Sequence, residues 1–315
     1  MATAAFPPPK QVRLPDLTLS VHDAGSGPAV VLCHGFPELG YSWRHQFPAL
    51  VGAGFRAIAP DQRGYGASGA PREIEAYGIE RLTGDLVAML DALDIERAVF
   101  VGHDWGGFVA WAMPFFHPAR TAGVIGVNTP YRPMPTMALL RSAFPDEDGM
   151  YILWFQKDGV AEKVLDANPR VVFERLMRHG APLERLAPSV TDFNPFRRLD
   201  SLPQIGASLL SEKELDVYAS AFAKTGFRGG INWYRNIDRN QSRFPGVGTQ
   251  PLEIPCLMVT AEWDFALRPE MAAGMPALCR DLEMHSIAEC GHWTQQEKPA
   301  ELNRIMVDWL QRRFA

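Results

Sequence analysis

Residues 99–110, VFVGHDWGGFVA, contain an aspartate at a position where a side chain could act as a nucleophile. An apolar run ends in Gly-x-Asp-x-Gly and leads into a second apolar segment, which is the pattern of a nucleophile elbow, a sharp turn between a strand and a helix. Such elbows usually present a serine, but Asp104 occupies the central position here. The alternative interpretation is that Asp104 only caps the helix that begins near Trp105, which is a common role for aspartate.

Two further titratable residues follow apolar, strand-like runs. Asp264 lies in VTAEWDFAL, and His292 lies in IAECGHWTQQEKP. Reactive residues of an open α/β sheet collect beyond the carboxyl ends of the strands, so these two side chains and Asp104 are expected to meet. Nucleophile, acid and histidine also follow one another in the order used by hydrolases with a strand-to-helix elbow. We therefore predict that Asp104, Asp264 and His292 form one catalytic site.

A carboxylate nucleophile suits a different reaction from a serine. With a reference pKa of about 3.9, an aspartate is ionised at neutral pH and can attack without the help of a base. Attack on an ester would give a reactive anhydride, so we expect Asp104 to attack a saturated carbon that bears a leaving group. The product is an alkyl ester on Asp104. We expect His292, oriented by Asp264, to activate the water that hydrolyses this ester.

Hydrolysis of that ester passes through an oxyanion, which needs two hydrogen-bond donors. In elbows of this kind the donors are the backbone N–H of the residue after the nucleophile and an N–H from an early strand loop. The first is predicted to be Trp105, and the second Phe36 in HGFPE. Pro37 has no N–H to donate, although it can stiffen the loop through a cis bond. His34 is expected to pin this loop by hydrogen bonding.

Strands and helices that could position these residues alternate along the chain. The runs AVVLCHGFP, RAIAPDQRG, RAVFVGHDWGG and AGVIGVNTP indicate buried strands, and residues 80–93 carry a helical apolar stripe. This alternation predicts an α/β fold, with a mostly parallel central sheet and helices on both faces. Residues 136–245 are helical in character and lack strand-like runs. We predict a core made of residues 1–135 and 246–315, interrupted by a helical cap over residues 136–245.

Composition and charge exclude several classes of function. The chain has 315 residues, of which 47% are hydrophobic, and a net charge of -5 without a dense Lys/Arg run, so nucleic acid is not an expected partner. No stretch approaches the roughly 18 apolar residues of a membrane span. The N-terminal MATAAFPPPKQVRLP lacks the apolar region of a secretory signal. Four cysteines without metal or disulfide spacing suit a reducing cytoplasm, and we expect a cytoplasmic protein.

Several motifs resemble those of the epoxide hydrolases of the α/β-hydrolase fold: HGFPE, YSWRHQ, APDQRGYGAS, GHDWGG, AEWDF and ECGHWTQ. The resemblance covers both core segments and extends into the cap, where YILWFQKDGVAE and FRGGINWYRNIDRN are similar to the two segments that supply a tyrosine pair. Those tyrosines fall on Tyr151 and Tyr234. The resemblance implies that both hydroxyls bind the epoxide oxygen and protonate the alkoxide, which a phenol with a pKa near 10 can do at neutral pH.

The resemblance implies an α/β-hydrolase fold and an enzyme that converts small hydrophobic epoxides into vicinal diols. Water is then the second substrate, and no metal or organic cofactor is expected because the His, Asp and Glu residues show no ligand spacing. The substrate pocket is expected to be apolar and aromatic. Candidate pocket residues are Phe36, Trp105, Trp154, Phe155, Trp233, Phe265, Leu267 and Trp293.

Other classes of protein with similar cores remain alternatives. Haloalkane dehalogenases also use an aspartate that is often followed by tryptophan, but halide release needs N–H donors, whereas the two tyrosines favour an epoxide. Fluoroacetate-type dehalogenases need arginines beside the nucleophile, where this chain has Trp105 and Phe108. An esterase needs an elbow serine, and Ser68 lacks the strand-to-helix context. A non-catalytic binding protein of this fold typically lacks a triad member, and all three are present here.

Overall fold

The structure, a computed structural model, describes residues 6–182, 185 and 193–315. Residues 1–5 of the N-terminal stretch, and residues 183–184 and 186–192 of the predicted cap, therefore lie outside the described residues. An eight-stranded sheet runs through the molecule in the order β1-β2-β4-β3-β5-β6-β7-β8. Its strands are β1 (Lys10–Arg13), β2 (Thr18–Ala24), β3 (Ala29–Cys33), β4 (Arg56–Asp61), β5 (Ala98–His103), β6 (Thr121–Val127), β7 (Leu252–Ala261) and β8 (Cys279–Ile287).

The sheet is mostly parallel, as the alternation of strands and helices predicts. β2 pairs antiparallel with both β1 and β4, and every pairing from β4 across to β8 is parallel. Strands β3, β5 and β6 are buried along their whole length. A parallel strand is covered on both faces, so its sequence is a continuous apolar run instead of an alternating one. The runs AVVLC, AVFVGH and TAGVIGV in the sequence follow from this burial.

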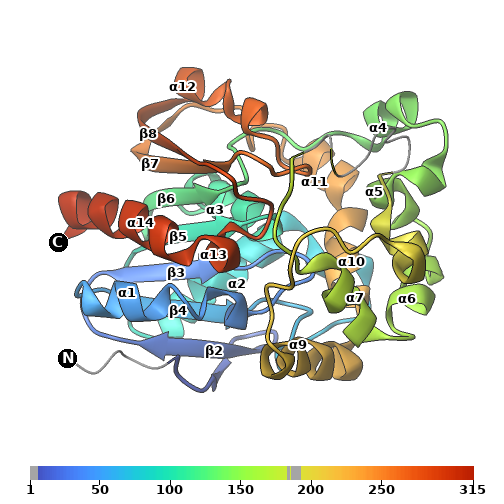
Figure 1. Cartoon of the computed structure of the whole chain (residues 1–315). Coiled ribbons are helices and arrows are strands. Elements are labelled where there is room, and N and C mark those ends of the chain that lie inside the picture. Colours follow the sequence, from blue (N-terminus) through green and yellow to red (C-terminus); the bar gives the residue numbers. More distant parts are fainter. Residues whose placement is uncertain (1–5, 183–184, 186–192) are drawn as a thin grey trace.

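Helices cover both faces of the sheet (Figure 1). Val30 and Leu32 of β3 pack in one buried cluster with α1 and α14, whereas Val31 packs in the other cluster with α2 and α3. Neighbouring residues of one strand therefore face opposite layers, as the two-residue period of a strand requires. The helices and short 3-10 turns outside the insertion are η1 (Gly40–Trp43), α1 (Phe47–Gly52), η2 (Ile74–Tyr77), α2 (Ile79–Ala92), α3 (Trp105–Phe116), η3 (Pro118–Arg120), η6 (Pro269–Ala272), α12 (Met275–Leu278), α13 (Thr294–Glu297) and α14 (Pro299–Phe314).

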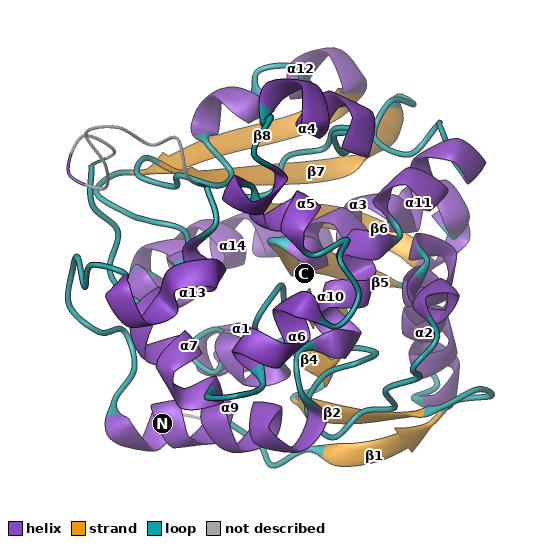
Figure 2. Cartoon of the chain, turned by 90° about the vertical axis from the view of Figure 1, so that its right-hand side faces the viewer, coloured by secondary structure: helices purple, strands orange, loops and turns teal. Residues whose placement is uncertain are grey.

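A helical insert, which we define as the described residues from α4 to α11, separates β6 from β7. It faces the viewer in Figure 2. Its elements are α4 (Met137–Ala143), η4 (Glu147–Gly149), α5 (Tyr151–Trp154), α6 (Val160–Leu165), α7 (Pro169–Leu176), η5 (Pro195–Ser201), α9 (Glu212–Thr225), α10 (Arg228–Arg235) and α11 (Ile237–Arg243). Rings of the insert contact Phe36, which follows β3, and Trp105, which follows β5. The insert therefore lies over the carboxyl ends of the strands.

The two connections between the sheet and the insert touch each other. Gly248, just before β7, has a φ of +84°, and a Cβ there would overlap the backbone of Arg132 and Pro133. Only a glycine fits both the left-handed conformation and this close approach. The chain thus enters and leaves the insert at one point.

The four cysteines, Cys33, Cys256, Cys279 and Cys290, are buried and free. Cys33 and Cys256 pack in the hydrophobic core. None of the helices formed by the described residues combines the length and the apolar character that a membrane crossing requires.

Candidate active site

Asp104 lies at the sharp turn between β5 and α3. Its backbone angles are φ 49° and ψ −124°, a region that residues with a Cβ rarely adopt. The turn brings backbone segments close together, because a Cβ at Gly102 would overlap the carbonyl group of Gly106, and a Cβ at Gly106 would overlap that of Cys33. The side chain of Asp104 makes no capping hydrogen bond to α3. The interpretation of Asp104 as an ordinary helix cap is therefore wrong.

Backbone donors from two loops hold the Asp104 carboxylate. The N–H of Phe36 donates to Oδ1 at 2.7 Å, and the adjacent N–H of Trp105 also interacts with this carboxylate. These are the two N–H groups that the sequence predicts as oxyanion donors. An oxyanion formed on the carboxyl group of Asp104 itself would lie within reach of both, where preorganised donors stabilise it most effectively.

His34 fixes the loop that presents Phe36. Its Nδ1 lies 2.9 Å from the carbonyl oxygen of Gly35, and its Nε2 accepts the backbone N–H of Gln62 at 3.0 Å. A carbonyl only accepts and an N–H only donates, so the ring is neutral and carries its proton on Nδ1. Burial lowers the pKa of His34 and favours this neutral form. The predicted pinning role of His34 is confirmed, and the Phe36–Pro37 peptide bond is cis.

His292 lies between the two aspartates. Its Nδ1 is 2.9 Å from Oδ2 and 3.1 Å from Oδ1 of Asp264, and its Nε2 is 3.8 Å from Oδ2 of Asp104. Nδ1 therefore donates to Asp264, and Nε2 points towards the elbow carboxylate. The structure thus brings together the three side chains that the sequence places at separate strand ends.

Asp264 accepts several hydrogen bonds besides that from His292. The N–H groups of Ala266 and Leu267 donate to Oδ1 at 2.9 and 3.0 Å, and Asn128 Nδ2 donates to Oδ2 at 2.6 Å. Burial alone would raise the pKa of Asp264, but the charge of His292 and these hydrogen bonds lower it to about 2. Asn128 directly follows β6, at the edge of the sheet where the site forms. The sequence analysis missed it, although its position after the run AGVIGV was a usable signal.

Charges also couple His292 to Asp104. Burial opposes protonation of His292, yet Asp264 and, to a smaller extent, Asp104 raise its pKa to about 9. Burial raises the pKa of Asp104, while the charge of His292 and the N–H of Phe36 counteract that rise. The two groups therefore stabilise each other as an ion pair.

A second buried pair of a carboxylate and a histidine, Glu38 and His103, supports the loop that carries His292. His103 Nε2 donates to the carbonyl oxygen of His292 at 2.6 Å, and its Nδ1 lies 2.8 Å from Oε2 of Glu38. Glu38 also accepts the N–H of Gly35 at 2.9 Å and Gln295 Nε2 at 2.6 Å. Burial would raise the pKa of Glu38, but His103 and the N–H donor lower it. This network joins three segments: the loop of Phe36, the elbow, and the loop that carries His292, which we call the histidine loop. The sequence analysis did not find this network.

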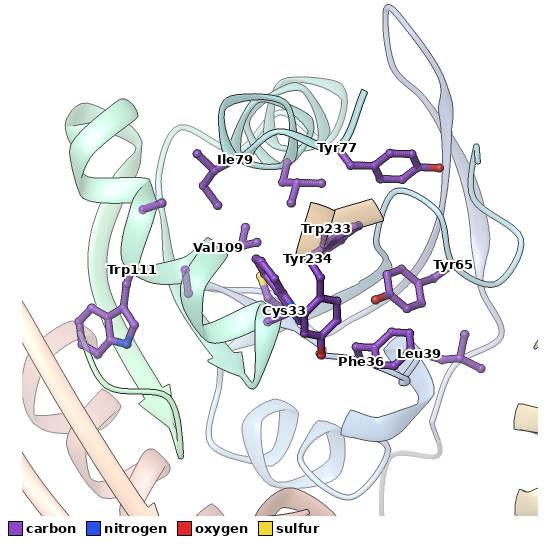
Figure 3. Close-up of a cluster of buried hydrophobic side chains, with 14 of the residues drawn as sticks. Cys33, Phe36, Leu39, Tyr65, Tyr77, Ile79, Val109, Trp111, Trp233 and Tyr234 are labelled. Atoms are coloured by element: carbon purple, nitrogen blue, oxygen red, sulfur yellow. The ribbon is translucent and has the colours of Figure 1, made fainter. Parts of the chain in front are cut away.

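Tyr151 and Tyr234 lie together over the elbow. Their ring centroids are 5.7 Å apart, and the ring of Tyr234 is 5.0 Å from Trp105 and 5.4 Å from Phe36. Figure 3 shows the hydroxyl end of Tyr234 beside Phe36. Burial raises the pKa of both tyrosines, and the negative charge of Asp104 adds to the rise. Both phenols are therefore protonated at neutral pH.

The predicted pocket residues occupy different places. The ring centroid of Phe155 is 5.4 Å from that of Phe36 and 5.0 Å from that of Tyr234. Phe36 and Phe155 therefore form an aromatic wall beside the tyrosine pair. Phe196 completes this wall, 5.7 Å from Tyr151 and 5.1 Å from Phe155, and was missed because its own segment of sequence carries no motif. The wall is therefore built mainly by the helical insert.

The remaining candidates lie around the histidine loop or pack between layers. The ring of Trp293 is 4.7 Å from His292, whereas Phe265 is half exposed with its ring 6.3 Å from His292. Trp154 is buried against Phe155, and Trp233 is fully buried with its Nε1 donating to the carbonyl of Arg63. Leu267 contributes its N–H to Asp264.

A narrow cavity lies next to Trp105, where α3, α11 and the two connections of the insert meet. Its apolar lining includes Phe108, Trp111, Tyr131 and Phe244. Asp104 and the two tyrosines do not line this cavity, so Trp105 stands between it and the reactive groups. Among the described residues, no group of three or more His, Cys, Asp or Glu side chains is arranged to hold a metal ion.

Comparison with known proteins gives concordant matches. Residues 28–299 match the family model described as alpha/beta hydrolase fold. The chain is 44% identical over 306 residues to "Bifunctional epoxide hydrolase 2" of Sus scrofa, covering 94% of this chain and 54% of that protein. It therefore spans about half the length of this relative. It is also 40% identical to "Epoxide hydrolase A" of Mycobacterium tuberculosis, covering 93% and 94% of the two chains.

Solved structures agree with these sequence matches. The crystal structure of epoxide hydrolase A from Mycobacterium thermoresistibile superposes with a TM-score of 0.86 at 38% identity and covers 97% of this chain and 98% of that chain. An epoxide hydrolase from an endophytic Streptomyces gives a TM-score of 0.85 at 33% identity, covering 96% and 95%.

The ion pair around His292 leads to a prediction that a titration can test. Replacing Asp264 by Asn removes the main influence that raises the pKa of His292, so the ring should lose its proton at a lower pH than about 9. An NMR titration of the His292 imidazole in both proteins measures this shift. Asp281→Asn, which removes a carboxylate paired with Arg313 at the surface, is the matched control. An unchanged titration in Asp264→Asn would contradict the assignment.

Proposed function

The chain belongs to the epoxide hydrolases of the α/β-hydrolase fold family, and on this premise we propose that it opens hydrophobic epoxides to vicinal diols with water as co-substrate. One observation carries the proposal: two protonated tyrosines lie side by side over a buried carboxylate that is held at a strand-to-helix elbow. Such a site offers a nucleophile on one side of a substrate and an acid on the other.

In the first step, the carboxylate of Asp104 attacks one carbon of the epoxide. Oδ1 accepts the N–H of Phe36, so Oδ2 is proposed as the attacking oxygen. The C–O bond of the ring breaks as the ester bond forms, and its electron pair remains on the epoxide oxygen. Tyr151 or Tyr234 donates its proton to that oxygen. Their raised pKa values keep both phenols protonated until the alkoxide develops.

In the second step, His292 removes a proton from a water molecule that attacks the carboxyl carbon of the Asp104 ester. The N–H groups of Phe36 and Trp105 stabilise the oxyanion, and its collapse breaks the ester C–O bond. The departing alkoxide takes the proton of the newly formed carboxylic acid and leaves as the diol, which restores the carboxylate. The proton on His292 returns through solvent to the tyrosinate left by the first step. Esterification removes the negative charge of Asp104, which is one of the influences that raise the pKa of His292. The first step therefore makes His292 a more readily available neutral base for the second.

The indole N–H groups argue against a halide as the leaving group. Trp233 donates to the carbonyl of Arg63, and Trp293 donates to the carbonyl of Leu176 at 2.7 Å. The indole of Trp105 packs against the ring of Tyr234 and interacts with its hydroxyl group. Each of these donors is already engaged within the protein. This arrangement supports an epoxide over the haloalkane alternative.

The aromatic wall supports a hydrophobic substrate. Phe36, Phe155 and Phe196 surround the tyrosine pair with apolar surface, and no arginine is adjacent to the elbow nucleophile in the sequence. Apolar pockets with a few convergent polar groups favour neutral, hydrophobic ligands. We propose that the cap over residues 136–245 provides both this wall and the acid.

The overall proposal is tested by turnover of styrene oxide and 1-chlorobutane in parallel. We expect diol from the first and no chloride from the second, and Asp104→Ala should form no diol because the nucleophile is gone. Circular dichroism verifies that this variant is folded. Chloride without diol would favour the dehalogenase, and neither product would favour a non-catalytic binding protein. Diol formation by Asp104→Ala would exclude the covalent mechanism.

Replacing His292 by Gln should separate the two steps. The variant retains Asp104 and the tyrosines, so it should still open the epoxide, but it lacks the base that activates water. We expect one equivalent of alkyl-enzyme to accumulate, detected as added mass on the intact protein. The double variant Asp104→Ala/His292→Gln is the control and should gain no mass. A His292→Gln variant that turns over without an adduct would show that His292 is not the hydrolytic base.

Replacing Tyr151 or Tyr234 by Phe should slow ester formation by about tenfold to a thousandfold, because one of two proton donors is lost. Single-turnover kinetics with styrene oxide measure this rate. Tyr77→Phe provides a matched control, since the Tyr77 hydroxyl donates to the carbonyl of Pro71 instead. If both single variants and the double variant formed the ester at the wild-type rate, another group would have to be the acid.

A further inference from the structure

A single buried carboxylate joins the helical insert to the loop of His292. Glu297, the last residue of α13, accepts the N–H of Gly291 through Oε2 at 2.9 Å and the N–H of Gly180 through Oε1 at 3.0 Å. Its side chain is only 2% exposed, and Oε1 also lies 3.5 Å from Nδ1 of His179. Gly291 directly precedes His292, whereas Gly180 belongs to the insert.

The two N–H groups belong to backbones that touch each other. A Cβ built on Gly291 would lie 2.6 Å from Cα of Gly180, closer than real side chains approach. Both positions therefore need glycine for steric reasons. The carboxylate of Glu297 accepts a hydrogen bond from each backbone, so the distance between the Gly180 and Gly291 segments depends on this side chain.

Residues beside Glu297 dock on the same part of the insert. Trp293 Nε1 donates to the carbonyl of Leu176 at 2.7 Å, and Gln296 Nε2 contacts the sulfur of Met177 at 3.6 Å. The segment that follows His292 therefore rests against the end of α7 and the residues just after it. Any shift of this part of the insert is transmitted to the histidine loop.

We propose that Glu297 is a positioning residue that links the docking of the insert to the orientation of His292. This inference rests on the function proposed above, and it assigns Glu297 to the hydrolysis step alone. Asp104 is held by the N–H groups of Phe36 and Trp105, and the two tyrosines are on α5 and α10, to which the contacts of Glu297 do not extend. Formation of the alkyl ester therefore uses no group that Glu297 contacts.

The replacement Glu297→Gln tests this selectivity with little change in shape. A carboxylate accepts through both oxygens, whereas glutamine accepts through one and presents an NH₂ group at the other position. One of the two backbone N–H groups then faces a donor, which pushes the insert and the histidine loop apart. A misplacement on the order of 1 Å slows a proton transfer by up to about a hundredfold.

The experiment is a single turnover of styrene oxide, quenched over time and followed by intact-protein mass. We expect the ester to form at close to the wild-type rate and to decay about tenfold to a hundredfold more slowly, so that alkyl-enzyme accumulates. The matched control is Glu80→Gln, which breaks ion pairs between α2 and α11 on the other side of the insert (Figure 2) and should leave decay unchanged. Equal slowing of both steps, or of neither, would overturn the proposal.

Gly180→Ala provides a second variant that keeps Glu297 itself intact. Its Cβ would push against Gly291 and displace the same contact from the insert side. We expect the same selective slowing of ester decay, and this result would support the proposal even if Glu297→Gln failed to fold. Normal decay in a folded Gly180→Ala variant would contradict it. If the wild-type protein formed no ester at all, the proposed function itself would be wrong, which is a distinguishable outcome.

Discussion

The burial of a carboxylate at the carboxyl end of β5 is the constraint on which the rest of the site depends. A buried charge is stable only where donors and an opposite charge surround it. Asp104 has the N–H of Phe36 and Trp105 on one side and His292 on the other. To bring these groups together, the chain adopts a left-handed conformation at Asp104 and places glycines where backbones meet. The donors that stabilise the resting carboxylate are also those proposed to stabilise the oxyanion.

Much of this arrangement could be predicted from the sequence because it is local or follows from topology. The elbow glycines, Asp104 and Trp105 are adjacent in one motif, and parallel strands end at one edge, so Asp264 and His292 had to lie nearby. The loop of Phe36 follows the first parallel strand for the same reason. The mostly parallel sheet was predictable from apolar runs that are buried on both faces.

What the sequence could not reveal depends on packing between distant segments. Glu38 and Phe196 act through partners that are far away along the chain, and no spacing rule identifies such pairs. Trp154 and Phe265 were plausible pocket residues by type, but the direction of a side chain from an irregular segment follows from its neighbours. Trp154 packs against Phe155, and Phe265 is half exposed to solvent.

The contact between Gly248 and Arg132 has a consequence for how such chains diversify. Because the insert begins and ends at one point, the length of its segments away from Gly180 can change without altering the register of β6 with β7. Mutation can therefore remodel the aromatic wall, provided that the tyrosine pair and the contact between Gly180 and Gly291 are kept. New substrate preferences are accessible to this architecture by loop grafting, without redesign of the sheet.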